Sequence, residues 1–217
     1  MYFTGNTTFR NNSVKYVGGI YAWSSIINFA GNRTFRNNTA EYVGGIRAWH
    51  MSTLNFSGGT IFINNVAVYG GGIRTSSSSL YFIGNTSLRN NSAKDGGGIY
   101  AIYSTLNFNG KIALRNNSAK ENCGGIWAFV STLNFTGNTT FKDNWALFGG
   151  GICTFTSILD FTDSSGPNIT GTGSGGFCSF TLVFINNSAQ VHGGAIYTSD
   201  STLNFDGCNT FSGNSAQ

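Results

Sequence analysis

The chain has 217 residues, of which 9% are charged, with one proline, 31 glycines and a formal net charge of +4. Ordinary globular domains are about 25% charged, so a disordered, highly charged tail is excluded. The 40% of apolar residues is enough for a core. No apolar run approaches the roughly 18 residues of a membrane-spanning helix. We therefore expect a folded chain without a membrane span.

A sequence repeat runs along the whole chain. Gly-Gly-Ile recurs at intervals of 26 or 27 residues. Its isoleucines are Ile20, Ile46, Ile73, Ile99, Ile126 and Ile152, and a Gly-Gly-Ala-Ile variant ends at Ile196. A second pattern, Phe/Leu-x-x-Asn, ends at Asn12, Asn38, Asn65, Asn91, Asn117, Asn144, Asn187 and Asn214. Because the two patterns keep step, we expect about eight units of about 26 residues.

Three short strands are predicted in each unit. In one unit they cover, in chain order, 125–129, 131–135 and 140–142, where side chains alternate with the period of two that is typical of strands. Gly-Gly, Gly-Asn and Asn-Asn pairs separate them and favour tight turns. A leucine-rich repeat needs a different leucine register, and a propeller blade needs about 40 residues. We therefore expect an all-β fold, a single-stranded parallel β-helix in which each unit forms one coil.

Residues of one type recur at equivalent positions of the units. Coils of a β-helix stack about 4.8 Å apart, so such columns are expected to face inward. We expect the asparagines of Phe/Leu-x-x-Asn to form an inward ladder in which each side chain bonds to the next. The one large departure is an inserted Gly/Ser-rich loop at 162–183. The sequence predicts one β-helix domain over 1–217 that is a fragment of a larger protein.

The paired Gly-Gly-Ala-Ile and Phe-x-x-Asn patterns resemble the repeats of the polymorphic outer-membrane proteins of chlamydiae. Phe-x-x-Asn is literal in six of eight coils, with Leu88 and Leu114 in the others, and Gly-Gly-Ala-Ile is literal only at 193–196. The resemblance covers nearly the whole chain. It implies a right-handed, pectin-lyase-like β-helix that is displayed outside the cell or on its surface as an adhesin-like or structural protein.

Extracellular display would permit two covalent features. Twelve Asn-x-Ser/Thr sequons are glycan acceptors in a eukaryotic secretory protein, although turns rich in Asn, Ser and Thr also produce sequons by composition alone. An even number of cysteines allows two disulfides in any of three pairings, with free buried thiols as the alternative. The four cysteines are Cys123, Cys153, Cys178 and Cys208.

A column of cations follows the Phe/Leu of the second pattern and is expected to face outward. We call it the basic ladder, and it consists of Arg10, Arg36, Arg89, Arg115 and Lys142. Like charges stacked this closely repel one another, so an anionic partner would relieve them. The functional interpretation is binding of an acidic polysaccharide or an anionic cell surface. The alternative is a solvated face whose charges prevent edge aggregation.

A column of aromatic residues lies beside Gly-Gly-Ile and is also expected to face outward. This aromatic stripe consists of Tyr21, Trp23, Trp49, Tyr100, Trp127 and Phe129, with Arg47 and Arg74 interleaved. Exposed aromatic rings with arginines between them suit stacking on sugar rings or a contact with a cell-surface protein. The alternative is that neighbouring turns or domains cover them.

The competing function is that of a carbohydrate-active enzyme, a polysaccharide lyase or glycosidase. Such catalysis needs a placed pair of carboxylates or an acidic calcium site. The candidates beside the insertion are Asp160, Asp163, Asp200 and Asp206, and no motif fixes them. We therefore expect no catalytic residue, no metal and no cofactor. Because no recognised module occurs, we also expect no nucleic-acid partner.

Charge is divided unevenly along the chain. All 12 Lys and Arg lie at or before Lys142, together with three of the eight acidic residues. From Asp143 onward there are five acidic residues and no base. Stacked coils would therefore form a rod with a basic end and an acidic end, which predicts end-to-end self-association.

Overall fold

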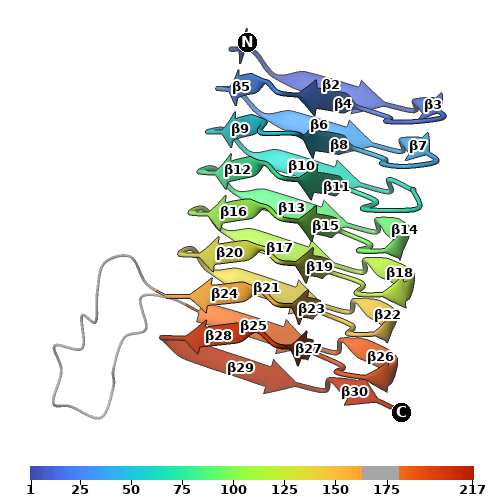
Figure 1. Cartoon of the computed structure of the whole chain (residues 1–217), viewed down its shortest axis with the longest axis vertical. Helices are drawn as coiled ribbons and strands as arrows, with labels where there is room; N and C mark the ends of the chain where they lie inside the picture. The colour runs from blue at the N-terminus through green and yellow to red at the C-terminus, as the bar shows by residue number, and fades with distance from the viewer. Residues whose placement is uncertain (163–180) are drawn as a thin grey trace, which may run out of the picture.

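The structure is a computed structural model that describes residues 1–162 and 181–217. These residues form stacked turns of β-strands, with no helix in the described part of the chain. Figure 1 shows the turns stacked along the long axis, with the N-terminus and the C-terminus at opposite ends. The predicted all-β parallel solenoid is confirmed, and its seven- and eight-stranded sheets correspond to seven to eight turns. Most of the predicted insertion at 162–183 lies outside the described residues.

Most turns contribute four strands, one to each of four faces, which we number as sheets 1 to 4. The turn of β9, β10 and β11 has only isolated bridges at Val66 and Tyr69 on the sheet 3 face. Sheet 1 consists of β1 (Tyr2–Phe3), β5 (Ile26–Phe29), β9 (Thr53–Phe56), β12 (Ser79–Phe82), β16 (Thr105–Phe108), β20 (Thr132–Phe135), β24 (Ile158–Phe161) and β28 (Thr202–Phe205). Sheet 2 consists of β2 (Thr7–Arg10), β6 (Arg33–Arg36), β10 (Thr60–Ile63), β13 (Thr86–Arg89), β17 (Ile112–Arg115), β21 (Thr139–Lys142), β25 (Thr181–Ile185) and β29 (Cys208–Ser212).

The other two faces complete each turn. Sheet 3 consists of the pair β3 (Ser13–Val14) and β7 (Thr39–Ala40) and the group β14 (Ser92–Asp95), β18 (Ser118–Asn122), β22 (Trp145–Phe148), β26 (Ser188–His192) and β30 (Ser215–Ala216). Sheet 4 consists of β4 (Ile20–Trp23), β8 (Ile46–Trp49), β11 (Ile73–Ser76), β15 (Ile99–Ile102), β19 (Ile126–Phe129), β23 (Ile152–Phe155) and β27 (Ile196–Ser199).

Sheet 3 is the difference from the sequence prediction, which gave three strands per unit. Its first strands, β3 and β7, are only two residues long, and later pairs contain register shifts. Two residues cannot show a period of two, and the later strands of four or five residues contain register shifts that interrupt the repeat. The sequence prediction therefore missed this face. The other three faces correspond to the three predicted strands.

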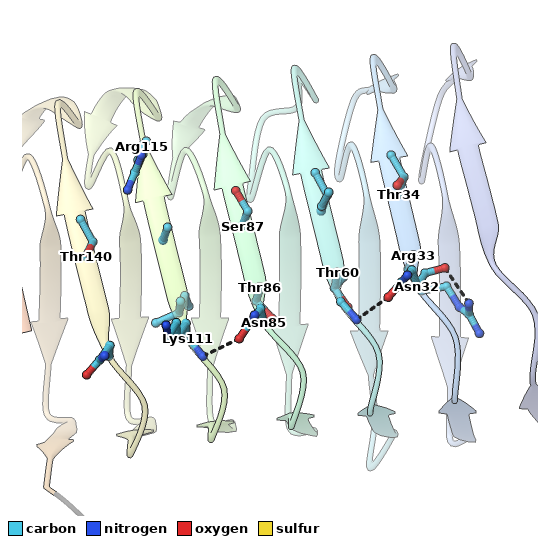
Figure 2. Close-up of a pocket in the computed structure, with 15 residues that line it drawn as sticks. Asn32, Arg33, Thr34, Thr60, Asn85, Thr86, Ser87, Lys111, Arg115 and Thr140 are labelled. Atoms are coloured by element: carbon cyan, nitrogen blue, oxygen red, sulfur yellow. Dashed lines mark hydrogen bonds between the residues drawn. The ribbon is translucent and has the colours of Figure 1, made fainter. Parts of the chain in front are cut away.

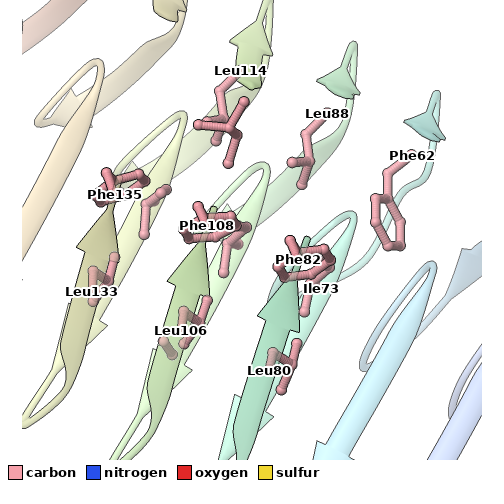
Figure 3. Packing of buried hydrophobic residues seen from close by; sticks show 14 of the residues in the cluster. Phe62, Ile73, Leu80, Phe82, Leu88, Leu106, Phe108, Leu114, Leu133 and Phe135 are labelled. Carbon is pink, nitrogen blue, oxygen red and sulfur yellow. The ribbon is translucent and has the colours of Figure 1, made fainter. Parts of the chain in front are cut away.

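Stacked aromatic and aliphatic columns fill the interior. On sheet 1, the rings of Phe56, Phe82 and Phe108 stack with centroids 4.8 and 5.0 Å apart. The isoleucines that begin the strands of sheet 4, such as Ile73 and Ile99, are fully buried opposite them. Figure 3 shows Phe82, Phe108 and Ile73 among the buried side chains that pack inside the coils. On sheet 1 each coil repeats the phenylalanine in register, so each ring stacks on the ring of the next coil, whereas on sheet 2 Leu88 and Leu114 interrupt the rings.

The predicted inward asparagine ladder is confirmed. Asn91 is fully buried, and its Nδ2 donates to Asn117 Oδ1 at 3.0 Å and to the Phe62 carbonyl at 3.1 Å. Its Oδ1 accepts hydrogen bonds from the backbone N–H and the Nδ2 of Asn65. The same bonds join successive coils along the chain, with Nδ2 to Oδ1 distances of 2.8 to 3.0 Å. The ladder thus satisfies buried polar groups at the corner between sheets 2 and 3.

The residue before each ladder asparagine makes the turn at this corner. Asn90 has a φ of 54°, and the equivalent Asn64 and Asn116 have 54° and 52°. Asparagine tolerates this left-handed conformation better than most residues with a side chain. The first asparagine of each Asn-Asn pair therefore provides the positive φ of the turn, and the second forms the hydrogen bonds of the inward ladder that join successive coils.

Candidate functional site

The basic ladder lies on the outer face of sheet 2. Backbone pairing places Arg10 beside Arg36 and then Arg89 beside Arg115, which pairs in turn with Lys142. The four arginines are exposed and Lys142 is half-buried. Ile63 on β10 separates Arg36 from Arg89. The structure therefore brings the five cations into one column with a single uncharged interruption.

A groove of about 690 Å³ runs beside the ladder across five strands of sheet 2. Its floor is formed by short outward side chains such as Thr34, Ser87 and Thr140, and Arg115 rises at one edge. Lys111, in the turn before β17, lies at the other edge (Figure 2). The backbone N–H of Lys111 is held by Asn85 Oδ1 at 3.2 Å. The groove thus has one lining cation on each rim and neutral residues between them, all small except Ile61.

The charges of the groove are only lightly compensated. In the described residues there are two ion pairs, and one of them joins Lys142 to Asp143 at 3.9 Å between partly exposed groups. The other, Lys94 to Glu121 at 3.3 Å, belongs to sheet 3. There the hydrogen bond to Glu121 raises the pKa of Lys94. The remaining ladder cations and Lys111 have no acidic partner in the part of the chain that the structure describes.

One cation of sheet 2 points the opposite way. Arg33 is 1% exposed and donates hydrogen bonds to the carbonyls of Phe3 at 2.7 Å and of Asn32 at 2.8 Å. Its guanidinium lies over the ring of Phe29 at 5.0 Å. Desolvation by burial lowers the pKa of Arg33. The sequence shows this inward position, because Arg33 lies two residues before the inward Phe35.

The aromatic stripe lies on the outer face of sheet 4. Tyr21 and Trp23 at its N-terminal end are 50% and 52% exposed. Trp49, Tyr100, Trp127 and Phe129 are half-buried. They cover one another, as in the stack of Tyr100 on Trp127 with centroids 4.3 Å apart. The structure therefore gathers the stripe on one face, but much of its ring area is already in contact.

Two arginines and two further tyrosines belong to the same surface. Arg47 and Arg74 pair in register on β8 and β11. Tyr42 and Tyr69 lie in the segments that precede these strands, with ring centroids 5.9 Å from Arg47 Cζ and 4.8 Å from Arg74 Cζ. The sequence interpretation did not include the two tyrosines, because they lie outside the repeating strands. Their spacing of 27 residues was the available signal.

Burial alters the titration of this surface. Desolvation is the main cause that lowers the pKa of Arg74, followed by the charge of Arg47. Desolvation also raises the pKa of Tyr100.

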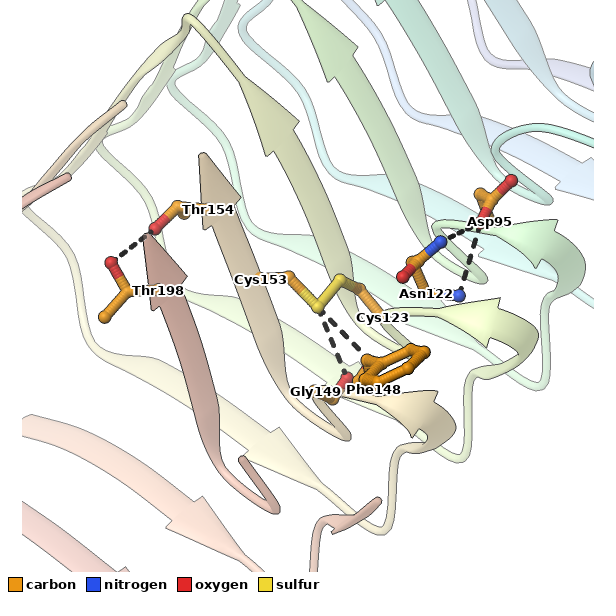
Figure 4. Close-up of a disulfide and its surroundings, with 8 residues drawn as sticks. All are labelled: Asp95, Asn122, Cys123, Phe148, Gly149, Cys153, Thr154 and Thr198. Carbon is orange, nitrogen blue, oxygen red and sulfur yellow. Dashed lines mark hydrogen bonds between the residues drawn. A yellow bond between two sulfur atoms is a disulfide. The ribbon is translucent and has the colours of Figure 1, made fainter. Parts of the chain in front are cut away.

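Two of the four cysteines fasten neighbouring coils. Cys123 and Cys153 form a disulfide with a Cα–Cα distance of 5.6 Å, and both are fully buried. Figure 4 shows the bond between the turn before β19 and the beginning of β23. Cys208 is also disulfide-bonded, and Cys178 lies outside the described residues.

The carboxylates of the enzymatic alternative are spread over the last turns. Asp160 lies on β24 beside Asn134 and Asn204, and Asp200 accepts a hydrogen bond from Ser199 Oγ at 3.1 Å. Asp206 follows β28, and Asp163 is outside the described residues. Within 1–162 and 181–217, no three His, Cys, Asp or Glu residues gather in a way that could hold a metal ion.

Comparison with known proteins gives one family. The model of the Chlamydia polymorphic membrane protein repeat matches residues 79–102 and 181–199. Residues 79–102 and 181–199 are therefore similar to this repeat. The predicted resemblance to this repeat family is thus confirmed, and the matched segments lie within the β-solenoid. No curated protein and no solved structure matches the chain.

The two matched segments follow the strands of single turns. The first covers the four strands β12 to β15, and the second covers the three strands β25 to β27. Each includes a ladder asparagine, Asn91 or Asn187, and the isoleucine of the glycine motif, Ile99 or Ile196. This repeat family indicates a protein of the cell surface or outer membrane. The described part of the chain has no helix long and apolar enough to cross a bilayer.

Proposed function

We propose that the chain is an adhesin-like part of an extracellular or cell-surface protein that binds an acidic polysaccharide along the outer face of sheet 2. The observation that carries this proposal is the stacking of Arg89, Arg115 and Lys142 in register on consecutive strands, beside a groove that Lys111 also borders. Strands in a sheet are about 4.8 Å apart. A linear polyanion along the solenoid axis would therefore meet one cation in each of the three coils that contain β13, β17 and β21.

Charge arrangement favours this face over the others. The outward positions of the groove are neutral and, except for Ile61, small, so an extended chain can approach the backbone between Arg115 and Lys111. Mutual repulsion of the stacked cations decreases when an anion is bound, and exposed charges of this kind act over about 8 Å at physiological ionic strength. Binding should therefore weaken as salt is added. The proposal concerns binding and assigns no catalytic step.

Heparin chromatography with a salt gradient tests the proposal. The variant Arg89→Gln/Arg115→Gln removes two ladder cations, and Lys15→Gln/Lys120→Gln removes two exposed cations from other faces. We expect the unaltered chain to be retained, the ladder variant to elute at clearly lower salt, and the control variant to elute near the unaltered chain. Equal shifts for both variants would show that net charge alone causes retention and would overturn the proposal. A shortened polymer after incubation would support the enzymatic alternative.

A further inference from the structure

The outer face of sheet 4 holds two arginines without an anionic partner in residues 1–162 and 181–217. Arg47 and Arg74 lie directly beside one another on β8 and β11. Neither side chain takes part in an ion pair or a hydrogen bond within these residues, and the Nε atom of each is buried without a partner. The buried Nε atoms are out of reach of a ligand, so an acceptor from outside would bind the Nη groups of these two neighbouring arginines.

Aromatic rings surround this arginine pair on several sides. The Cζ atom of Arg47 lies 4.4 Å from the ring centroid of Trp49 and 5.2 Å from that of Tyr21. The Cζ atom of Arg74 lies 5.4 Å from the Trp49 centroid and 4.8 Å from that of Tyr69. Ring contacts of this kind stabilise a cation and fix the orientation of the guanidinium N–H groups. They supply no hydrogen-bond acceptor in the plane of the guanidinium.

The surroundings also show what kind of ligand would fit. A carboxylate can accept paired N–H bonds from a guanidinium, so one carboxylate could bridge the two arginines. The rings of Trp49, Tyr21 and Trp23 continue the surface toward the N-terminal end, and Tyr21 and Trp23 are about half exposed. A flat ring with C–H groups would pack on them. A ligand for this site therefore combines an anionic group with a ring.

We propose that Arg47, Arg74, Trp49 and Tyr21 form a binding site for a carboxylated sugar residue. The carboxylate is held between the two guanidiniums, and the pyranose ring packs on the aromatic faces beside them. This site goes beyond the proposed function, because it lies on another sheet and recognises a single acidic sugar rather than a run of charges. Its arginines belong to the aromatic stripe and not to the basic ladder.

Ligand-observed NMR with two matched pairs of soluble sugars tests the site. The carboxylated probes are 3′-sialyllactose and a hyaluronan tetrasaccharide, and the neutral controls are lactose and tetra-N-acetylchitotetraose. We expect saturable binding of at least one carboxylated probe with a dissociation constant of about 1 mM or tighter, equivalent to about −4 kcal/mol. The neutral partner of that probe should bind at least tenfold more weakly.

Two double variants separate this site from the basic ladder. Arg47→Gln/Arg74→Gln should weaken binding of the carboxylated sugar at least tenfold while circular dichroism shows an intact fold. Arg89→Gln/Arg115→Gln removes the same charge from sheet 2 and should leave the sugar affinity unchanged. In heparin chromatography the larger effect should come from the ladder variant, so failure of one proposal is distinguishable from failure of the other.

Three results would overturn this inference. The first is the absence of saturable binding by both carboxylated probes. The second is equal loss of sugar binding in the two double variants. The third is competition by acetate or by a short peptide with a free carboxyl terminus at the same concentration as the sugar, which would show that the site recognises the anion without the ring.

Discussion

The inward and outward columns of the solenoid differ in how uniform they are. Inside, the same asparagine bond and the same phenylalanine stack recur from coil to coil. Outside, equivalent positions change type, as where Ile63 interrupts the arginines of sheet 2 or Tyr100 follows Arg74 on sheet 4. Stacking of the coils therefore requires the same residue type only at inward positions, where each side chain contacts the equivalent side chain of the next coil. Outward positions can differ from coil to coil and can therefore contact a ligand.

Inward residues should therefore determine the stability of the fold, and outward residues should determine its binding of ligands. Inward groups are bonded on both sides, so a change in one coil leaves unpaired groups in two. Outward cations such as Arg89 have one exposed side and no bonded partner in the described structure. Changes to inward columns should therefore reduce stability, and changes to outward columns should reduce binding.

The glycine motif should show the largest effect. A Cβ atom at Gly125 would lie 2.2 Å from the carbonyl oxygen of Gly151 in the next coil, and a backbone atom cannot move aside without separating the coils. We expect Gly125→Ala to destabilise the chain by at least about 4 kcal/mol, in the range reserved for severe core defects, as measured by denaturant unfolding.

Gly59→Ala is the matched control for this substitution. The nearest atom to its added Cβ is Oδ1 of Asn32 at 3.2 Å, and this exposed side chain can shift. The cost should therefore be below about 1 kcal/mol. If the two alanine variants unfold at the same denaturant concentration, close packing of the glycine backbones does not hold the coils together.

The asparagine ladder should show the next largest effect. Asn91→Ala removes an acceptor for two groups of Asn65 and a donor to Asn117 and Phe62. At about 1–3 kcal/mol for a buried unsatisfied group, we expect a loss of about 3 kcal/mol in the free energy of unfolding. Urea unfolding followed by circular dichroism measures it.

The neighbouring residue provides the control for the ladder. Asn90 has positive φ and is exposed, so Asn90→Gly keeps the turn geometry and should cost less than about 1 kcal/mol. If Asn90→Gly reduced the free energy of unfolding more than Asn91→Ala, the assignment would be wrong: Asn90 would not act only in the turn, and Asn91 would not provide the main hydrogen bonds between coils.

The serine corner between sheets 4 and 1 should show a smaller effect. Ser104 Oγ donates to the Ile102 carbonyl at 2.7 Å and accepts from the backbone N–H of Ser78 at 3.3 Å. Ser104→Ala should therefore cost about 1 kcal/mol. The outward Ser79→Ala should be nearly neutral in the same unfolding assay, and equal costs would argue against a role of this corner in stacking.

The sequence was sufficient to predict which residues form the inward columns, but it was not sufficient to predict several contacts on the outer surface. The repeat spacing placed Asn91 and its equivalents inside, because only an inward residue needs the same neighbour in every coil. It did not reveal the short strands such as Thr39–Ala40, since two residues show no alternation. It also missed Tyr42 and Tyr69, because segments between strands have no fixed direction until the coil is closed around them.

The most direct test measures stability and binding on one protein. Arg89→Gln/Arg115→Gln alters only exposed side chains of sheet 2, so its free energy of unfolding should stay within about 0.5 kcal/mol of the unaltered chain. Its affinity for a heparin oligosaccharide of defined length should fall at least tenfold at low salt, and the difference should shrink as salt is added. Unchanged affinity with an intact fold would contradict the assignment of binding to this face.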